Sequence, residues 1–281
     1  MRRRFLAAGL AMLGLVAAAP ATGAESEKAP LRLAIHPYAS TLTLINTFRP
    51  LQRYLAESLG RPVEFYTAPN FEAFVDSLLS GAYDIAISPP HFAVMAMDKD
   101  YLPLLHFRTS LEPVLVVMHD SPAQQAKDFR GKRLAMADRT AFIRLVAVKW
   151  LADGGLQAGR DYQIVERPSH GAAVGAVKAG EADGGLATTT GLRQLPPELQ
   201  QQVRAISTGL RLPHLFTMAH SRLGEPLLGR LRLALLAFPA TEEGRLFMAK
   251  TAFGGYEPIT DEKIRLLAPY VELYRRLEPG R

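Results

Sequence analysis

The chain has 281 residues, 48% of them hydrophobic, and no cysteine. It is long enough for two modest domains. The lack of cysteine excludes disulfides, thiolate metal sites, a cysteine nucleophile and lipid attachment through a cysteine. The formal net charge is +6 at pH 7, but the basic residues are scattered along the chain. We therefore expect no nucleic-acid partner.

The first residues have the pattern of a secretory signal peptide. Arg2–Arg4 form a basic start, residues 5–19 are apolar or small, and small residues up to Ala24 suit a cleavage site. We predict a cleaved signal peptide at residues 1–24 and a periplasmic protein. Two alternatives stay open, namely twin-arginine export and a permanent anchor. The apolar stretch is shorter than the ~20 strongly apolar residues of a membrane span, which disfavours the anchor.

The first half of the remaining chain alternates short apolar runs with amphipathic stretches. Apolar residues recur at helical spacing in residues 41–59, from Leu44 through Phe48 to Leu55, and Gly60 ends the pattern. The expected strands are Leu31–His36, Val63–Ala68 and Asp84–Ser88, and the expected helices are residues 41–59, Phe71–Leu79 and Pro90–Met97. Two further apolar runs, Leu102–Arg108 and Leu111–His119, are predicted to cross into a second unit.

The same alternation then restarts. The expected strands are Lys132–Ala137, Tyr162–Val165 and Gly184–Ala187, and the expected helices are Thr140–Asp153, His170–Gly180 and a polar helix at Leu192–Val203 that Pro196 and Pro197 interrupt. Leu210–Ala219 is expected to be extended and to carry the chain back. Three helices are predicted in the tail, at Glu225–Ala237, Glu242–Ala249 and Thr260–Leu277.

Two similar βαβα units joined by two crossovers predict a two-lobed α/β protein. Each lobe is expected to be a mostly parallel sheet flanked by helices. We predict residues 31–112 plus 216–281 as lobe one and residues 113–215 as lobe two. Ligands of open α/β sheets bind outside the carboxyl ends of the strands. The site is therefore expected at the loops after Ile35, Ile87, Ala137, Pro168 and Ala187, where polar residues gather.

Several short motifs resemble a known family. They are Phe48-Arg49-Pro50-Leu51, Leu79-Ser80-Gly81 with Tyr83-Asp84-Ile85-Ala86, Phe129-Arg130-Gly131-Lys132, Ser169-His170 with Ala172-Ala173, Ala179-Gly180-Glu181-Ala182-Asp183, and Gly255-Tyr256 before Pro258. Their order resembles the phosphate/phosphite/phosphonate-binding family of periplasmic solute-binding proteins of ABC importers, which have the type II periplasmic-binding-protein fold. The resemblance covers nearly the whole chain after residue 24. It implies a non-enzymatic receptor that passes its ligand to a membrane permease.

The resemblance also suggests site residues. His170 matches a ligand-binding histidine of the family, and Thr188 matches a ligand-contact position. This chain departs from the family at three places. Pro89-Pro90 replaces a Gly-Pro, Arg139-Thr140-Ala141-Phe142 replaces a run of hydroxyl residues, and Thr188 replaces an acid that would pair with a ligand amine. The last change disfavours an aminophosphonate and favours a plainer anion.

The residues themselves point to a small anion held by helix N-termini, hydroxyls and imidazoles. Thr140 is expected to cap a helix whose free amides face the cleft. The guanidinium groups of Arg139 and Arg167 would suit an oxyanion. The full set of predicted ligand-binding residues is His36, Tyr38, Ser40, Ser88, His91, Arg139, Thr140, Arg167, His170 and Thr188, with Thr189 and Thr190 as neighbouring hydroxyls.

Three other functions compete with anion binding. His36, His91 and His170 together would suit a transition metal, but their spacing fits no compact metal motif. The chain has no Gly-x-Ser-x-Gly, His-Glu-x-x-His or Walker motif, so no enzyme and no cofactor are expected. A sensor that signals ligand occupancy to a membrane receptor stays open. We expect a monomer that closes on hinges near Arg108–Val114 and Gly209–His214.

Overall fold

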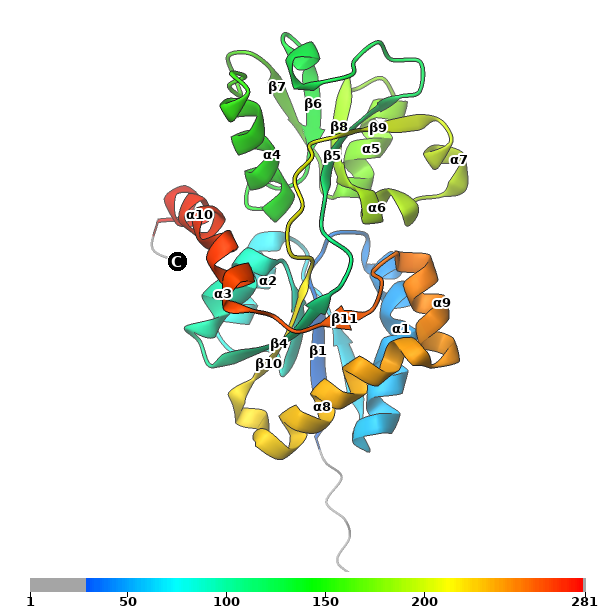
Figure 1. Ribbon diagram of the computed structural model, residues 1–281, viewed down its shortest axis with the longest axis vertical. Helices are drawn as coiled ribbons and strands as arrows, with labels where there is room; N and C mark the ends of the chain where they lie inside the picture. Colours follow the sequence, from blue (N-terminus) through cyan, green and yellow to red (C-terminus); the bar gives the residue numbers. More distant parts are fainter. Residues whose placement is uncertain (1–28, 280–281) are drawn as a thin grey trace, which may run out of the picture.

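The computed structural model describes residues 29–279. The predicted signal peptide lies outside this range. Figure 1 shows two lobes, one above the other, that are connected by extended segments. No helix within residues 29–279 combines the length and apolarity needed to cross a membrane.

Lobe one is built on a six-stranded sheet with the order β11-β4-β10-β3-β1-β2. Its strands are β1 (Leu31–Ile35), β2 (Val63–Tyr66), β3 (Ile85–Ser88), β4 (Tyr101–Phe107), β10 (Phe216–His220) and β11 (Tyr256–Glu257). Its helices are α1 (Thr41–Leu59), α2 (Phe71–Leu79), α3 (Pro90–Met97), α8 (Glu225–Ala237), α9 (Glu242–Thr251) and α10 (Asp261–Leu277). Short 3₁₀ helices lie at Ser221–Leu223 and Phe238–Ala240.

Lobe two is built on a five-stranded sheet with the order β7-β6-β8-β5-β9. Its strands are β5 (Pro113–Met118), β6 (Arg133–Met136), β7 (Gln163–Glu166), β8 (Gly184–Thr188) and β9 (Val203–Ser207). Its helices are α4 (Phe142–Asp153), α5 (His170–Lys178), α6 (Thr189–Arg193) and α7 (Pro197–Gln200), with a 3₁₀ helix at Ala126–Phe129.

The predicted two-lobed α/β architecture is confirmed, but both sheets are mixed. In each lobe three strands pair in parallel, β2-β1-β3 and β7-β6-β8. The returning strand β10 inserts antiparallel between β3 and β4, and β5 lies antiparallel between β8 and β9. The exact lobe limits stay a prediction, although β5 and β9 belong to the second sheet and β4 and β10 to the first.

Two predicted helices in lobe two differ from the structure. The polar helix expected at Leu192–Val203 is divided into α6 and α7, and Val203 instead begins strand β9. Val203 and Ile206 are buried in this segment, and β5 supplies the partner strand. The helix expected from Thr140 begins at Phe142, because Thr140 donates both its amide and its hydroxyl to Asp138 Oδ1, at 2.8 and 2.5 Å.

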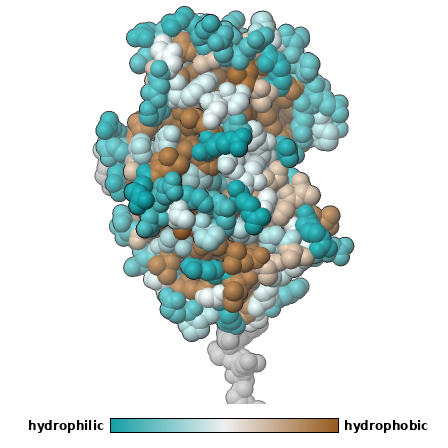
Figure 2. Space-filling model, viewed as in Figure 1, coloured by the Kyte–Doolittle hydropathy of each residue, from teal (hydrophilic) through white to brown (hydrophobic). Residues whose placement is uncertain are grey.

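The lobes are held together both within and outside the two crossing segments. Within these segments Leu111 and Leu212 form an antiparallel bridge, with N···O distances of 2.8 and 3.0 Å. Helix α10 packs on α3 of lobe one and also contacts α4 of lobe two. Tyr270 on α10 meets the ring of Phe142 on α4 at a centroid distance of 5.4 Å. Figure 2 shows an indentation at the right edge of the molecule between the two lobes.

The close packing of α5 on β8 predicts a stability difference between two glycines. A Cβ on Gly185 would lie 2.7 Å from the carbonyl oxygen of Ala173, whereas a Cβ on Gly175 meets nothing within 4 Å. We expect Gly185→Ala to lower the free energy of unfolding by about 1–3 kcal/mol because α5 must shift. Gly175→Ala is the control and should raise it by about 0.5–1 kcal/mol. Urea unfolding measures both, and equal effects would contradict the packing.

Candidate functional site

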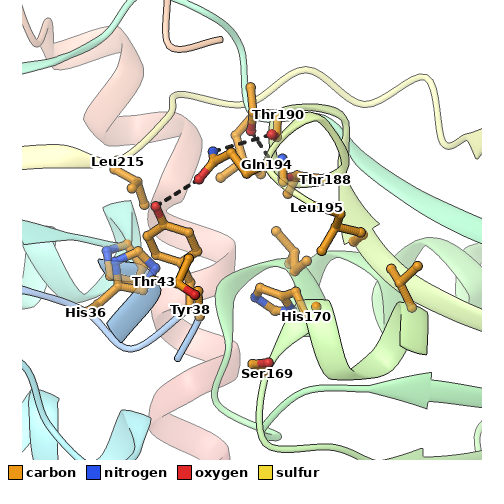
Figure 3. A pocket seen from close by; sticks show the side chains of 18 of the residues that line it. His36, Tyr38, Thr43, Ser169, His170, Thr188, Thr190, Gln194, Leu195 and Leu215 are labelled. Carbon is orange, nitrogen blue, oxygen red and sulfur yellow. Dashed lines mark hydrogen bonds between the residues drawn. The ribbon is translucent and has the colours of Figure 1, made fainter. Parts of the chain in front are cut away.

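A cavity of ≈ 250 Å³ lies between the two lobes. Residues of lobe one, lobe two and both crossing segments line it, as Figure 3 shows for its labelled side chains. The polar residues of the lining are His36, Tyr38, Ser40, Thr43, Ser169, His170, Thr188, Thr190, Gln194 and His214. The apolar residues include Phe71, Leu111, Phe142, Ile143, Val174, Leu195, Leu215 and Phe253.

Helix N-termini from both lobes face this cavity. Each helix follows a strand whose carboxyl end lies at the cleft, which brings its first turn to the same place. The first turns of α1, α4, α5 and α6 each contribute more than one lining residue, and α2 and α3 contribute one near their starts. The partial positive charge at a helix N-terminus favours an anion.

Three of these helices are capped by hydroxyls that also line the cavity. Ser40 accepts the amide of Thr43, Ser169 that of Ala172, and Thr188 that of Gly191, at N···O distances of 3.2, 3.2 and 2.9 Å. One first-turn donor of each helix is thereby satisfied by its own cap.

Helix α4 has no side-chain cap, because Ala141 stands at that position, and the carbonyl oxygen of Ala141 accepts the amide of Arg144 at 2.9 Å instead. The amides of Phe142 and Ile143 have no acceptor within the part of the chain that the structure describes. Both residues line the cavity. This corrects the prediction for Thr140, whose hydroxyl is bound to Asp138 and which does not line the cavity. The expected free amides exist, but they begin two residues later.

His36 and His170 face the cavity from opposite lobes. Phe71 lies beside both, with ring centroids 6.0 Å from His36 and 6.2 Å from His170. Burial lowers the pKa of His170 to about 4 and holds the pKa of His36 well below its ordinary value, with the neighbouring His170 as a further cause. Both imidazoles are therefore neutral at pH 7. The Nδ1 atom of each is buried without a hydrogen-bond partner in residues 29–279.

A chain of hydrogen bonds directs the hydroxyl of Thr188 into the cavity. The amide of Leu215 donates to His214 Nδ1 at 2.9 Å, so the proton of this imidazole is on Nε2. Burial lowers the pKa of His214 to about 3, which keeps it neutral. Nε2 then donates to Thr190 Oγ1 at 3.0 Å, and Thr190 lies 3.2 Å from Thr188 Oγ1. Because Thr188 Oγ1 also accepts the Gly191 amide, its own proton is left for a ligand acceptor.

Gln194 connects the lobes at the edge of the cavity. Its Oε1 accepts the hydroxyl of Tyr38 at 3.1 Å, and its Nε2 lies 3.3 Å from the carbonyl oxygen of Thr251. Tyr38 and Thr251 belong to lobe one, whereas Gln194 follows α6 of lobe two. Sequence reasoning missed Gln194 and His214 and treated Thr190 only as a neighbouring hydroxyl.

Five of the ten predicted ligand-binding residues line the cavity, and five lie elsewhere. His36, Tyr38, Ser40, His170 and Thr188 line it; Ser88, His91, Arg139, Thr140 and Arg167 do not. Whether any of the first group binds a ligand stays a prediction.

The other five have protein partners instead. Ser88 is fully buried and donates to the carbonyl of Pro89 at 3.2 Å. Arg139 pairs with Glu278 at 2.5 Å, and Arg167 pairs with Glu181.

His91 joins the two lobes rather than lining the cavity. Its Nε2 donates to the carbonyl of Thr140 at 3.0 Å, and its ring stacks on Phe92 and Phe142. The three histidines considered for a metal therefore do not converge. Among the residues that the structure describes, no group of three His, Cys, Asp or Glu side chains is placed to hold a metal ion.

Comparison with known proteins agrees with this geometry. A family model described as the periplasmic substrate-binding protein of ABC phosphonate transporters matches residues 33–264. The chain belongs to this phosphonate-binding family. The family resemblance inferred from the motifs is thereby confirmed, and proteins of this family work with the membrane components of an ABC transporter.

Solved structures show the same fold at low sequence identity. A binding protein of an ABC phosphonate transporter from Pseudomonas aeruginosa has a TM-score of 0.77 and 17% identity over 88% of this chain and 87% of its own. PhnD1 from Prochlorococcus marinus in complex with methylphosphonate has a TM-score of 0.77 and 14% identity over 88% and 98%. The alkanesulfonate-binding protein SsuA from Xanthomonas axonopodis pv. citri, bound to MOPS, has a TM-score of 0.65 and 20% identity over 91% and 96%.

The burial of His91 predicts a pH dependence of stability. Burial lowers the pKa of His91 to about 3, whereas an unfolded histidine titrates near 6.5. As the pH falls, the unfolded chain therefore binds the proton of His91 first. The free energy of unfolding is not reduced by this residue above pH ~6.5, and it decreases progressively below that pH. We expect His91→Asn to reduce the loss of unfolding free energy between pH 7 and pH 5 by about 2 kcal/mol.

Urea unfolding at the two pH values measures this difference. The control is His119→Asn, which removes an exposed histidine instead of a buried one. If both variants lose the same free energy as the native chain, burial of His91 does not couple to protonation.

Proposed function

We propose that the protein is a periplasmic receptor that captures a small oxyanion, such as phosphate, phosphite or a phosphonate, for an ABC importer. The observation that carries this proposal is the convergence of helix N-termini from both lobes on one cavity, which is also lined by two imidazoles whose Nδ1 atoms have no hydrogen-bond partner among the described residues. Oxyanions accept hydrogen bonds, and amides, hydroxyls and neutral Nε2–H or Nδ1–H groups donate them. The receptor binds and releases its ligand without chemical change.

Ligand-driven closure is the mechanism we infer. The lining combines His36, Tyr38 and Ser40 of lobe one with His170 and Thr188 of lobe two, so only a closed arrangement contacts the ligand from both sides. A ligand that binds one arrangement better shifts the population toward it. The two crossing segments, which pair at Leu111 and Leu212, are the hinge in this proposal. A closed receptor also supports the sensor function left open by the sequence, but the family favours delivery to a permease.

The imidazoles on the two sides of the cavity should determine affinity. A hydrogen bond to a charged ligand contributes about 1.5–3 kcal/mol, so His170→Ala and His36→Ala should each weaken binding about 10- to 100-fold. Isothermal titration calorimetry against phosphate, phosphite and alkylphosphonates measures the change. Arg167→Ala is the control, because Arg167 pairs with Glu181 away from the cavity, and it should change the affinity less than twofold. If both histidine variants bind the ligand with unchanged affinity, the ligand does not bind in this cavity as proposed.

Loss of the contact between the lobes should shift the receptor toward an open state. Gln194→Ala removes the bonds to Tyr38 and Thr251, so we expect a loss of affinity of up to about tenfold and a larger radius of gyration by X-ray scattering. Gln200→Ala is the matched control, since Gln200 binds the carbonyls of Arg193 and Leu195 within lobe two. If the two variants have the same radius of gyration, the bonds of Gln194 do not hold the lobes closed.

A further inference from the structure

The side chains around the cavity carry no formal charge. None of the described residues that line it is Asp, Glu, Lys or Arg. Charged groups on nearby segments are paired with each other, as in Arg139 with Glu278 and Arg144 with Glu166. An ammonium group on the ligand would therefore be buried without a carboxylate, which is strongly unfavourable.

The imidazoles do not change this balance. His36, His170 and His214 are neutral at pH 7 because burial disfavours their protonated forms. The positive potential that remains comes from the amides at the helix N-termini, including the unpaired amides of Phe142 and Ile143. Such amides bind the oxygens of an anionic head group and offer nothing to a second, cationic group.

Besides the imidazoles, hydroxyls and the amide of Gln194, the lining is hydrocarbon. Its apolar residues include Leu111, Phe142, Ile143, Val174, Leu195 and Leu215. The cavity of ≈ 250 Å³ has the volume of roughly eight waters at ~30 Å³ each, which is more than a lone tetrahedral oxyanion needs. A purely inorganic anion would leave apolar side chains facing poorly bonded water, whereas a hydrocarbon substituent would cover them.

We infer that the ligand is an organic oxyanion with an uncharged, apolar substituent of several carbons, in which the head group meets the helix N-termini and the substituent packs on the hydrocarbon wall. This inference rests on the proposed function and names its ligand class. A phosphonate and a sulfonate head group share this chemistry, and the arms of the experiment distinguish them.

A panel of defined anions tests the inference on the native protein. Calorimetry compares inorganic phosphate, methylphosphonate, n-butylphosphonate, n-butanesulfonate and 2-aminoethylphosphonate. The three methylenes that separate butyl- from methylphosphonate are each worth up to about fourfold in affinity, so we expect butylphosphonate to bind at least about tenfold tighter. 2-Aminoethylphosphonate should bind at least about tenfold more weakly than butylphosphonate. The butanesulfonate arm shows which head group is preferred.

Two variants then locate the substituent. Leu195→Trp adds volume at a half-buried wall position and should reduce the affinity for butylphosphonate at least about fivefold relative to methylphosphonate. Thr188→Asp places a carboxylate in the cavity and should reverse the preference between butyl- and 2-aminoethylphosphonate. Circular dichroism and thermal unfolding confirm that each variant is folded.

The outcomes separate the two proposals. If phosphate or 2-aminoethylphosphonate binds as tightly as butylphosphonate, the apolar-substituent inference is wrong and the oxyanion receptor stands. If none of the five anions binds, the proposed function itself fails. Tight binding of butylphosphonate that Leu195→Trp does not affect would place the substituent elsewhere and overturn the assignment of the wall.

Discussion

Burial of four imidazoles where the lobes meet determines the electrostatics of the cleft. His36, His91, His170 and His214 all have pKa values lowered by burial, so all four are neutral at pH 7. Two of them bind protein groups: His91 joins the lobes through Thr140, and His214 orders the hydroxyls of Thr190 and Thr188. His36 and His170 line the cavity, and the Nδ1 atom of each has no hydrogen-bond partner among the described residues. A neutral imidazole donates a hydrogen bond through one N–H group and carries no charge that needs a counterion, which suits a site without formal charge.

The fold supplies the positive potential that the side chains lack. In each lobe a helix follows each strand of the parallel trio, so its N-terminus lies at the carboxyl end of the sheet. The two lobes face each other, which brings these N-termini together around one cavity; Figure 3 shows this for Thr43 of α1, His170 of α5 and Thr190 of α6. In α4 the first two amides, those of Phe142 and Ile143, have no acceptor in the part of the chain that the structure describes. Backbone geometry therefore carries the general affinity for anions.

Side chains decide which anion fits, and here the chain differs from the pattern its family resemblance implies. Where the resemblance implies a run of hydroxyl residues, this chain has Arg139-Thr140-Ala141-Phe142, and Phe142 lines the cavity and contacts the ring of Tyr270 on α10. Relatives with this fold share 14–20% of their residues with the chain, and they are described with ligands as different as methylphosphonate and MOPS.

The sequence by itself determined the alternation of strands and helices, the two lobes and the family. These follow from local patterns, such as the apolar spacing of Leu44, Phe48 and Leu55 and the stop at Gly60, which has the left-handed backbone of a helix end. It also predicted two residues that line the cavity, His36 from its place after a strand and His170 from the family resemblance.

Only the tertiary structure decided which polar groups are already satisfied. Asp138 takes the hydroxyl of Thr140, Thr140 takes the imidazole of His91, and Gln194 reaches Tyr38 across 156 positions of the chain. Val203–Ser207 became a strand because β5 lay beside it. Hydrogen bonds and strand pairing between distant segments depend on where the folded chain brings them, and no local pattern of residues records that position.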